Sequence, residues 1–122
     1  MHIVVFGTGA VGGMLGARLA LSGQGVTFVA RPAVANAMTR SGLQLLMSGE
    51  THTISAPRGV TDVSQVPRHP PSDIVLLTVK GYDCAAAAVM LRDQWPDPPP
   101  VVCLLNGVGH EATLTSALGA DR

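Results

Sequence analysis

The sequence predicts an α/β fold in which helices cover both faces of an open parallel sheet. Short apolar runs alternate along the chain with longer segments whose apolar residues recur at helical spacing, as in strand–helix–strand units. The run Ile74–Leu77 is apolar at every position, as a central strand covered on both faces requires. With 122 residues, 47% of them hydrophobic, the chain is long enough for one domain, residues 1–122, with a real core.

Start and stop signals delimit the expected elements. Pro32 is suited to the first turn of a helix, because its missing N–H needs no partner there. Gly23, Gly42 and Gly119 are typical of helix ends, and Asp83 can cap the helix that follows it. The expected helices span residues 10–22, 32–41, 83–93 and a last stretch that contains Leu114 and Leu118. The expected strands span residues 3–6, 26–30, 43–47, 51–55, 73–79 and 101–105.

Residues 57–72 contain four prolines, which favour an irregular path. We expect this segment to cross the surface, with one helical turn near residues 62–66. Because parallel strands are joined by right-handed crossovers, the expected strand order is 3-2-1-4-5. Residues 43–47 take the third position in this order. A turn at residues 48–50 then leads into the polar strand 51–55, which forms a hairpin at the edge of the sheet.

A glycine-rich turn follows the first strand and opens the first helix. Its residues are Gly7, Thr8, Gly9, Ala10, Val11 and Gly12. Gly7 permits the sharp turn, Gly9 leaves room for a phosphate close to the backbone, and Gly12 lets the helix pack on the sheet. The amino terminus of the helix then offers free N–H groups to an anion. In this context the motif favours a Rossmann-type dinucleotide-binding domain over a turn whose glycines serve packing alone.

The end of the second strand bears on the choice of cofactor. Domains that bind NAD usually place an acidic residue there, where it bonds the ribose 2′-OH. This chain instead has Arg31, 19 positions after Gly12, and no acid. A guanidinium can grip a 2′-phosphate through paired N–H bonds, so the sequence favours NADP over NAD. The alternative is an exposed arginine at a helix start, where a cation is slightly unfavourable.

Two further polar residues follow predicted strands directly. Lys80 comes after the strand 73–79, and Asn106 comes after the strand 101–105. The carboxyl ends of parallel strands share one edge of the sheet, which is where ligands bind in such folds. Taken singly, Lys80 is equally well explained as a solvated loop cation, and Asn106 as a turn residue. Their common edge favours a role in binding.

Composition excludes several other classes of protein. The net charge is zero, which gives no support for binding nucleic acid. The amino terminus does not resemble a signal peptide and no apolar run is long enough to cross a membrane, so we expect a cytoplasmic protein. Cys84 and Cys103 are expected to be small buried residues rather than a disulfide. The four histidines lack the spacing of metal ligands, so no metal is expected.

Four stretches of the chain resemble the amino-terminal domain of the ketopantoate reductase family, the NADPH-dependent 2-dehydropantoate 2-reductases of pantothenate biosynthesis. They are GTGAVGGMLG at residues 7–16, VAR at 29–31, VKGYD at 79–83 and LNGVG at 105–109. The resemblance implies that the cofactor is NADP(H), with Arg31 and Lys80 at its adenosine-phosphate end. It also implies that Asn106 lies near the nicotinamide and binds the substrate, a small 2-keto acid.

The chain departs from that family in one respect. The family's enzymes have a second, helical domain that carries the lysine acting as general acid, whereas this chain ends where a sixth strand would begin. Lys80 is its only lysine and is assigned to the cofactor, so no catalytic residue is expected within residues 1–122. We therefore expect a cofactor domain that is inactive alone, with an open sheet edge that invites self-association or a partner domain. Two alternatives are a stand-alone nucleotide-sensing module and the cofactor domain of another two-domain NADP-dependent reductase.

Overall fold

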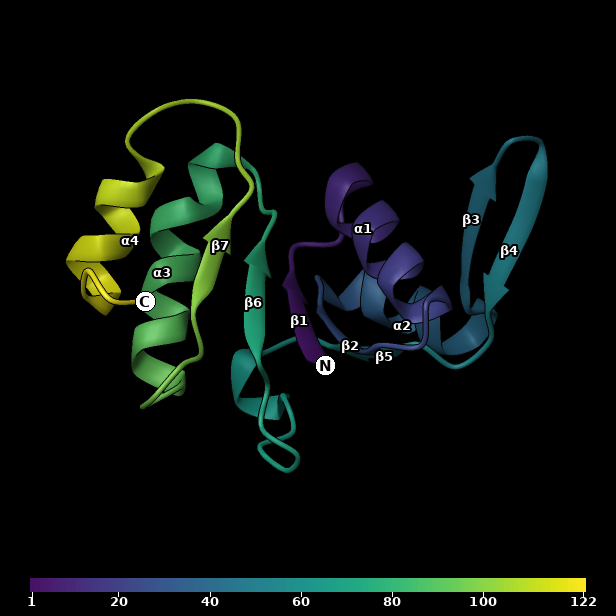
Figure 1. The fold of residues 1–122 in the computed structure, drawn as a ribbon, viewed down its shortest axis with the longest axis horizontal. Coiled ribbons are helices and arrows are strands. Elements are labelled where there is room, and N and C mark those ends of the chain that lie inside the picture. The colour runs from purple at the N-terminus through teal and green to yellow at the C-terminus, as the bar shows by residue number, and fades with distance from the viewer.

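A five-stranded parallel sheet forms the centre of the molecule in the computed structural model, which describes residues 1–122 (Figure 1). Its strands run in the order β5-β2-β1-β6-β7, which confirms the predicted order 3-2-1-4-5. Every pairing between neighbouring strands is parallel. The strands are β1 (His2–Phe6), β2 (Gly25–Val29), β5 (Arg58–Val60), β6 (Ile74–Leu77) and β7 (Val101–Cys103).

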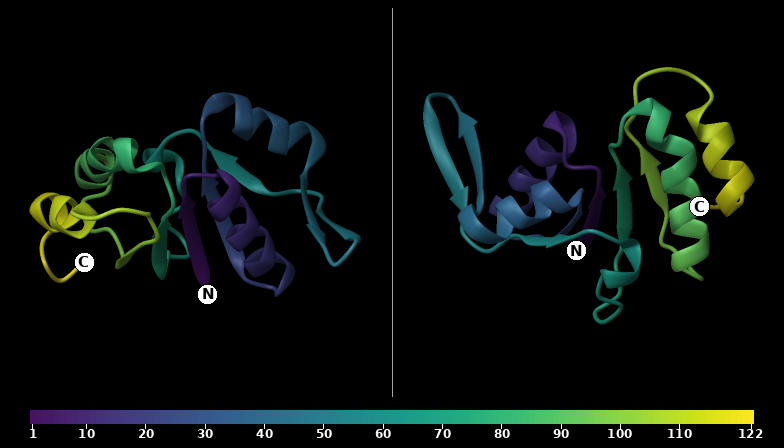
Figure 2. Two further views of the ribbon diagram at one scale, coloured as in Figure 1. Left: turned by 90° about the horizontal axis from the view of Figure 1, so that it is seen from above. Right: turned by 180° about the vertical axis from the view of Figure 1, so that it is seen from behind.

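Helices lie on both sides of this sheet, as the sequence predicts (Figure 2). Val4 and Phe6 of β1 belong to the larger core cluster, which packs against α3, α4 and the short helix η1. Ile3 and Val5 point to the opposite face, under α1 and α2. None of the helices is both long and apolar enough to span a bilayer. The helices are α1 (Ala10–Leu21), α2 (Pro32–Ser41), α3 (Cys84–Gln94), α4 (His110–Leu118), η1 (Val63–Gln65) and η2 (Gly81–Asp83).

The strand in the third position differs from the one predicted. Residues 43–47 do form a strand, β3 (Leu43–Met47), but it pairs only with β4 (Glu50–Ile54), in a separate antiparallel hairpin (Figure 1). The third position is taken by β5, which pairs with β2. Gly59 of β5 lets α2 come close, because a Cβ there would lie 3.3 Å from the sulfur of Met38. A three-residue strand containing a glycine leaves no apolar periodicity in the sequence, which explains the error.

The segment 57–72 also differs from the expectation, because it contributes to the core rather than only crossing the surface. Val63 and Val66 are 0% and 2% exposed. The helical turn expected near residues 62–66 is confirmed as η1, and the Asp62 side chain caps its amino end. This turn buries two valines under the sheet at the point where the chain returns from one edge of the sheet to its centre.

Candidate nucleotide-binding site

A cleft of about 660 Å³ lies at the carboxyl edge of the sheet, where β1, β2, β6 and β7 end. Its volume is in the range of small-molecule sites. The structure brings almost all of the predicted site residues to this one cleft. Those that line it are Gly7, Thr8, Gly9, Ala10, Val11, Arg31, Lys80 and Asn106. Only Gly12 lies outside the lining, on the side of α1 that packs against the sheet edge.

Gly7 and Gly12 are required by the fold itself. Gly7 has a φ of +104°, and a Cβ there would lie 2.7 Å from the backbone nitrogen of Val79. A Cβ on Gly12 would overlap the Gly7 carbonyl oxygen and the hydroxyl of Thr78. That hydroxyl donates a hydrogen bond to the Gly7 carbonyl and so ties the turn to the end of β6. Thr78, directly after β6, therefore supports the turn in a way that the sequence motif does not reveal.

Gly9 differs from both, because the fold does not require a glycine there. Its φ is −74°, which any residue can adopt, and apart from Gly9 and its two chain neighbours no atom lies within 4 Å of the position a Cβ would take. Gly9 itself lines the cleft. Gly9 is also the N-cap of α1, whose first turn has neither a side-chain cap nor an acidic residue. The unpaired N–H groups and the positive end of the helix dipole therefore face a space that can hold an anion.

Arg31 lies at the mouth of the cleft, at the N-cap of α2. Its side chain is 76% exposed, and its Nη2 lies 3.2 Å from a carboxylate oxygen of Asp83. The sequence predicts Asp83 as a cap for α3, and it does occupy the N-cap position. However, its side chain bonds no N–H of that helix and pairs with Arg31 instead. Asp83 is the last residue of the short helix η2, which precedes α3, and it lines the cleft.

The loops that carry Lys80 and Asn106 are held against each other by His110. Its Nε2 donates a hydrogen bond to the Asn106 carbonyl oxygen at 2.9 Å. The same ring lies close to Gly81 and Gly107, since a Cβ at either glycine would come within 3.1 Å of it. The sequence does not reveal the role of this histidine, because that role depends on two glycines that only the fold brings together.

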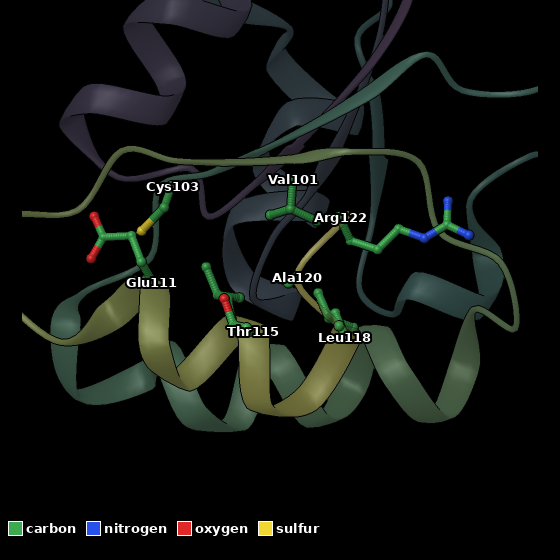
Figure 3. A pocket seen from close by; sticks show the side chains of 9 residues that line it. Val101, Cys103, Glu111, Thr115, Leu118, Ala120 and Arg122 are labelled. Atoms are coloured by element: carbon green, nitrogen blue, oxygen red, sulfur yellow. The ribbon is translucent and has the colours of Figure 1, made fainter.

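A second pocket, of about 230 Å³, lies between β7 and α4 (Figure 3). Cys103 and Glu111 lie at one end of it and Arg122 at the other, with the polar Thr115 and several apolar side chains between them. It contains none of the residues of the glycine-rich turn. Cys84 is buried in the neighbouring core, and burial, with smaller contributions from Cys103 and Glu111, raises the pKa of its thiol. The larger cleft is therefore the candidate site.

Comparison with known proteins identifies the family. The model of the family described as "Ketopantoate reductase PanE/ApbA" matches residues 3–122. The chain belongs to the ketopantoate reductase family. A 2-dehydropantoate 2-reductase of Halobacterium salinarum is 34% identical over 122 residues, which are 99% of this chain and 39% of that protein.

Solved structures of related proteins show the same fold. A PanE/ApbA family ketopantoate reductase from Ralstonia eutropha superposes with a TM-score of 0.87 at 32% identity, over 98% of this chain and 39% of the other. A D-mandelate dehydrogenase solved with NADH and anilino(oxo)acetate gives a TM-score of 0.80 at 27% identity, over 96% of this chain and 37% of the other. The chain thus spans well under half the length of these relatives.

Proposed function

We propose that residues 1–122 are the NADP(H)-binding domain of a ketopantoate reductase-like oxidoreductase. The observation that carries the proposal is the open space at Gly9. A glycine that the fold does not require stands at the uncapped amino end of α1, on the wall of a 660 Å³ cleft. That space fits a pyrophosphate approaching the backbone closely. Family membership favours such a reductase domain over a stand-alone nucleotide sensor.

In this proposal, different residues of the cleft bind different parts of the cofactor. The turn from Gly7 to Val11 binds the pyrophosphate through backbone N–H groups. Arg31 and Lys80 are the two cations of the cleft and hold the adenosine-phosphate end, with Arg31 on the 2′-phosphate. Asn106, at the end of β7, lies by the nicotinamide and the substrate. NADPH, when bound, supplies the hydride that reduces a 2-keto group.

The substrate of the whole enzyme is a small 2-keto acid in this account, with 2-dehydropantoate as the named candidate. The curated relatives carry that compound in their names. The described residues hold, orient and shield the cofactor, but Lys80 is the only lysine, and it lies among the cofactor-binding groups. Proton donation to the substrate therefore falls outside these residues.

Calorimetric titration of Gly9→Ala with NADPH tests the proposal. A methyl group at this position enters only the space assigned to the pyrophosphate, so affinity should fall at least about tenfold while the melting temperature stays unchanged. Gly13→Ala is the matched control, because its Cβ would meet only the Thr8 carbonyl oxygen, at 3.9 Å. It should bind NADPH within about twofold of the wild-type chain. Wild-type affinity in Gly9→Ala would show that the phosphates bind elsewhere.

A further inference from the structure

β2 is not followed by an acidic residue, but a carboxylate from another part of the chain lies at the same place. Asp83 lies 52 positions after Arg31, yet its carboxylate contacts the Arg31 guanidinium at 3.2 Å. Both side chains line the cleft, and Asp83 is its only acidic residue. The corner that sequence reasoning assigns to the ribose 2′-position therefore contains a cation and an anion side by side.

The contact leaves both groups available to a ligand. Arg31 uses a single nitrogen for Asp83, and its Nε and Nη1 have no protein partner. The Asp83 side chain is 35% exposed, and its carboxylate makes no hydrogen bond to the helix it precedes. Exposed pairs of this kind are weak, so a ligand can compete for either member. Neither side chain is required for the stability of the fold.

The two partners favour different cofactors. A 2′-phosphate drawn to Arg31 must lie within a few ångströms of the Asp83 carboxylate, and the two anions repel each other. A free 2′-hydroxyl has no such penalty, because a carboxylate can accept its hydrogen bond, as in domains that bind NAD. Lys80 is the other charged group of the cleft, and it adds attraction for phosphate groups of either cofactor.

We propose that Asp83 is a specificity-determining residue that lowers the preference of this cleft for NADP(H) and allows it to bind NAD(H) as well. The inference rests on the proposed function, since it assumes that the cleft holds a dinucleotide with its adenosine ribose beside Arg31. Arg31 attracts the 2′-phosphate, and Asp83 opposes that attraction by competing for the same guanidinium. The balance between the two cofactors is then set by a residue outside the strand-end position that usually sets it.

The test is the ratio of the Kd for NADH to the Kd for NADPH, measured by calorimetry at low salt. Asp83→Asn keeps the shape and an acceptor oxygen but removes the charge, and asparagine is also a good N-cap residue. We expect the ratio to rise about tenfold, from tighter NADPH binding together with weaker NADH binding. Asp93→Asn is the control, because it removes the same charge from the far end of the same helix, where Asp93 contacts Arg92. Its ratio should equal that of the wild-type chain.

A double-mutant cycle separates competition for Arg31 from a general charge effect. In an Arg31→Gln background, Asp83→Asn should still tighten NADPH binding by relieving the direct repulsion, but by less than in the wild-type background, because the contested guanidinium is gone. An equal gain in both backgrounds would show a general charge effect with no competition for Arg31. An unchanged or lower ratio in Asp83→Asn, in a chain that binds both nucleotides and melts normally, overturns the inference and leaves the proposed function standing. Failure of the wild-type chain to bind either nucleotide overturns the proposed function, and the inference with it.

Discussion

At the scale of single residues, the three glycines of the turn are distinguished by what surrounds each of them. Gly7 and Gly12 are fixed by neighbouring backbone and by Thr78, whereas Gly9 faces open space. The sequence predicts all three roles, because the strand–turn–helix context restricts what such a spacing can do. The Arg31–Asp83 contact could not be predicted in the same way. Its partners come from separate helix starts that only the assembled sheet places together.

Arg31→Asp should weaken NADPH binding much more than NADH binding. The change replaces a cation beside the expected 2′-phosphate with an anion, and a loss of at least about tenfold, or ~1.4 kcal/mol, is expected for an exposed site. Titration of both nucleotides into the variant and the wild-type chain provides the measurement. Arg40→Asp, in the last turn of the same helix, is the control and should affect neither affinity. An equal loss for NADPH and NADH in Arg31→Asp would remove Arg31 from the 2′-phosphate.

At the scale of elements, the sequence predicts the strand order, the four helices and the edge at which the site lies. It does so because long periodic runs and flanking glycines mark those elements clearly. β5 could not be predicted, because Arg58–Val60 owe their strand conformation to backbone pairing with β2. The burial of Val63 and Val66 was also not predicted, because the segment after β5 is rich in polar residues and proline. Both valines lie in or next to η1 and point into the core. Tertiary pairing, rather than local pattern, decides both cases.

The cap of η1 should make stability depend on pH. The Ser64 backbone N–H and hydroxyl both donate to the Asp62 carboxylate, and they lower its pKa below the usual 3.8. Because the folded-state pKa is the lower one, this contribution is full above the unfolded pKa and is lost as pH falls through the folded pKa. Asp62→Asn keeps an acceptor oxygen and should flatten that part of the profile.

Urea unfolding between roughly pH 2 and pH 6 provides the measurement. Asp121→Asn is the control, since Asp121 makes no hydrogen bond or ion pair, and it should follow the wild-type profile. A profile for Asp62→Asn that falls as steeply as the wild-type profile would show that the cap does not contribute.

At the scale of the whole molecule, one edge of the chain's sheet and one side of its cleft are open. β7 is the last strand of the sheet, and along its outer side one backbone bond is present, from the Val101 N–H to the Arg122 carbonyl oxygen. Tyr82, which lines the cleft, and Val108, on the loop before α4, are largely exposed. The relatives extend well beyond the matched region, because this chain covers 39% of the length of each. Self-association at the β7 edge stays a prediction.

The 122-residue chain should show no oxidation of NADPH that depends on 2-dehydropantoate. Correct positioning of the reacting groups contributes roughly 7–11 kcal/mol to such a reaction, and a general acid adds about a hundred- to ten-thousand-fold. In this account the 122 residues do not position the keto acid, and their only lysine is assigned to the cofactor. Loss of nicotinamide absorbance is the assay, with and without the keto acid. Turnover at a rate typical of enzymes would reveal a catalytic acid within these residues.

Amide chemical-shift mapping of the chain during titration with NADPH tests the central claim most directly, because it reports on both pockets at once. If the cleft at the carboxyl edge of the sheet binds the dinucleotide, the largest changes will fall on residues 7–12 and on Arg31, Lys80 and Asn106. The amides of Leu114, Thr115 and Leu118, which line the smaller pocket, should barely move. Changes centred on that pocket, or no changes at saturating NADPH, would contradict the account.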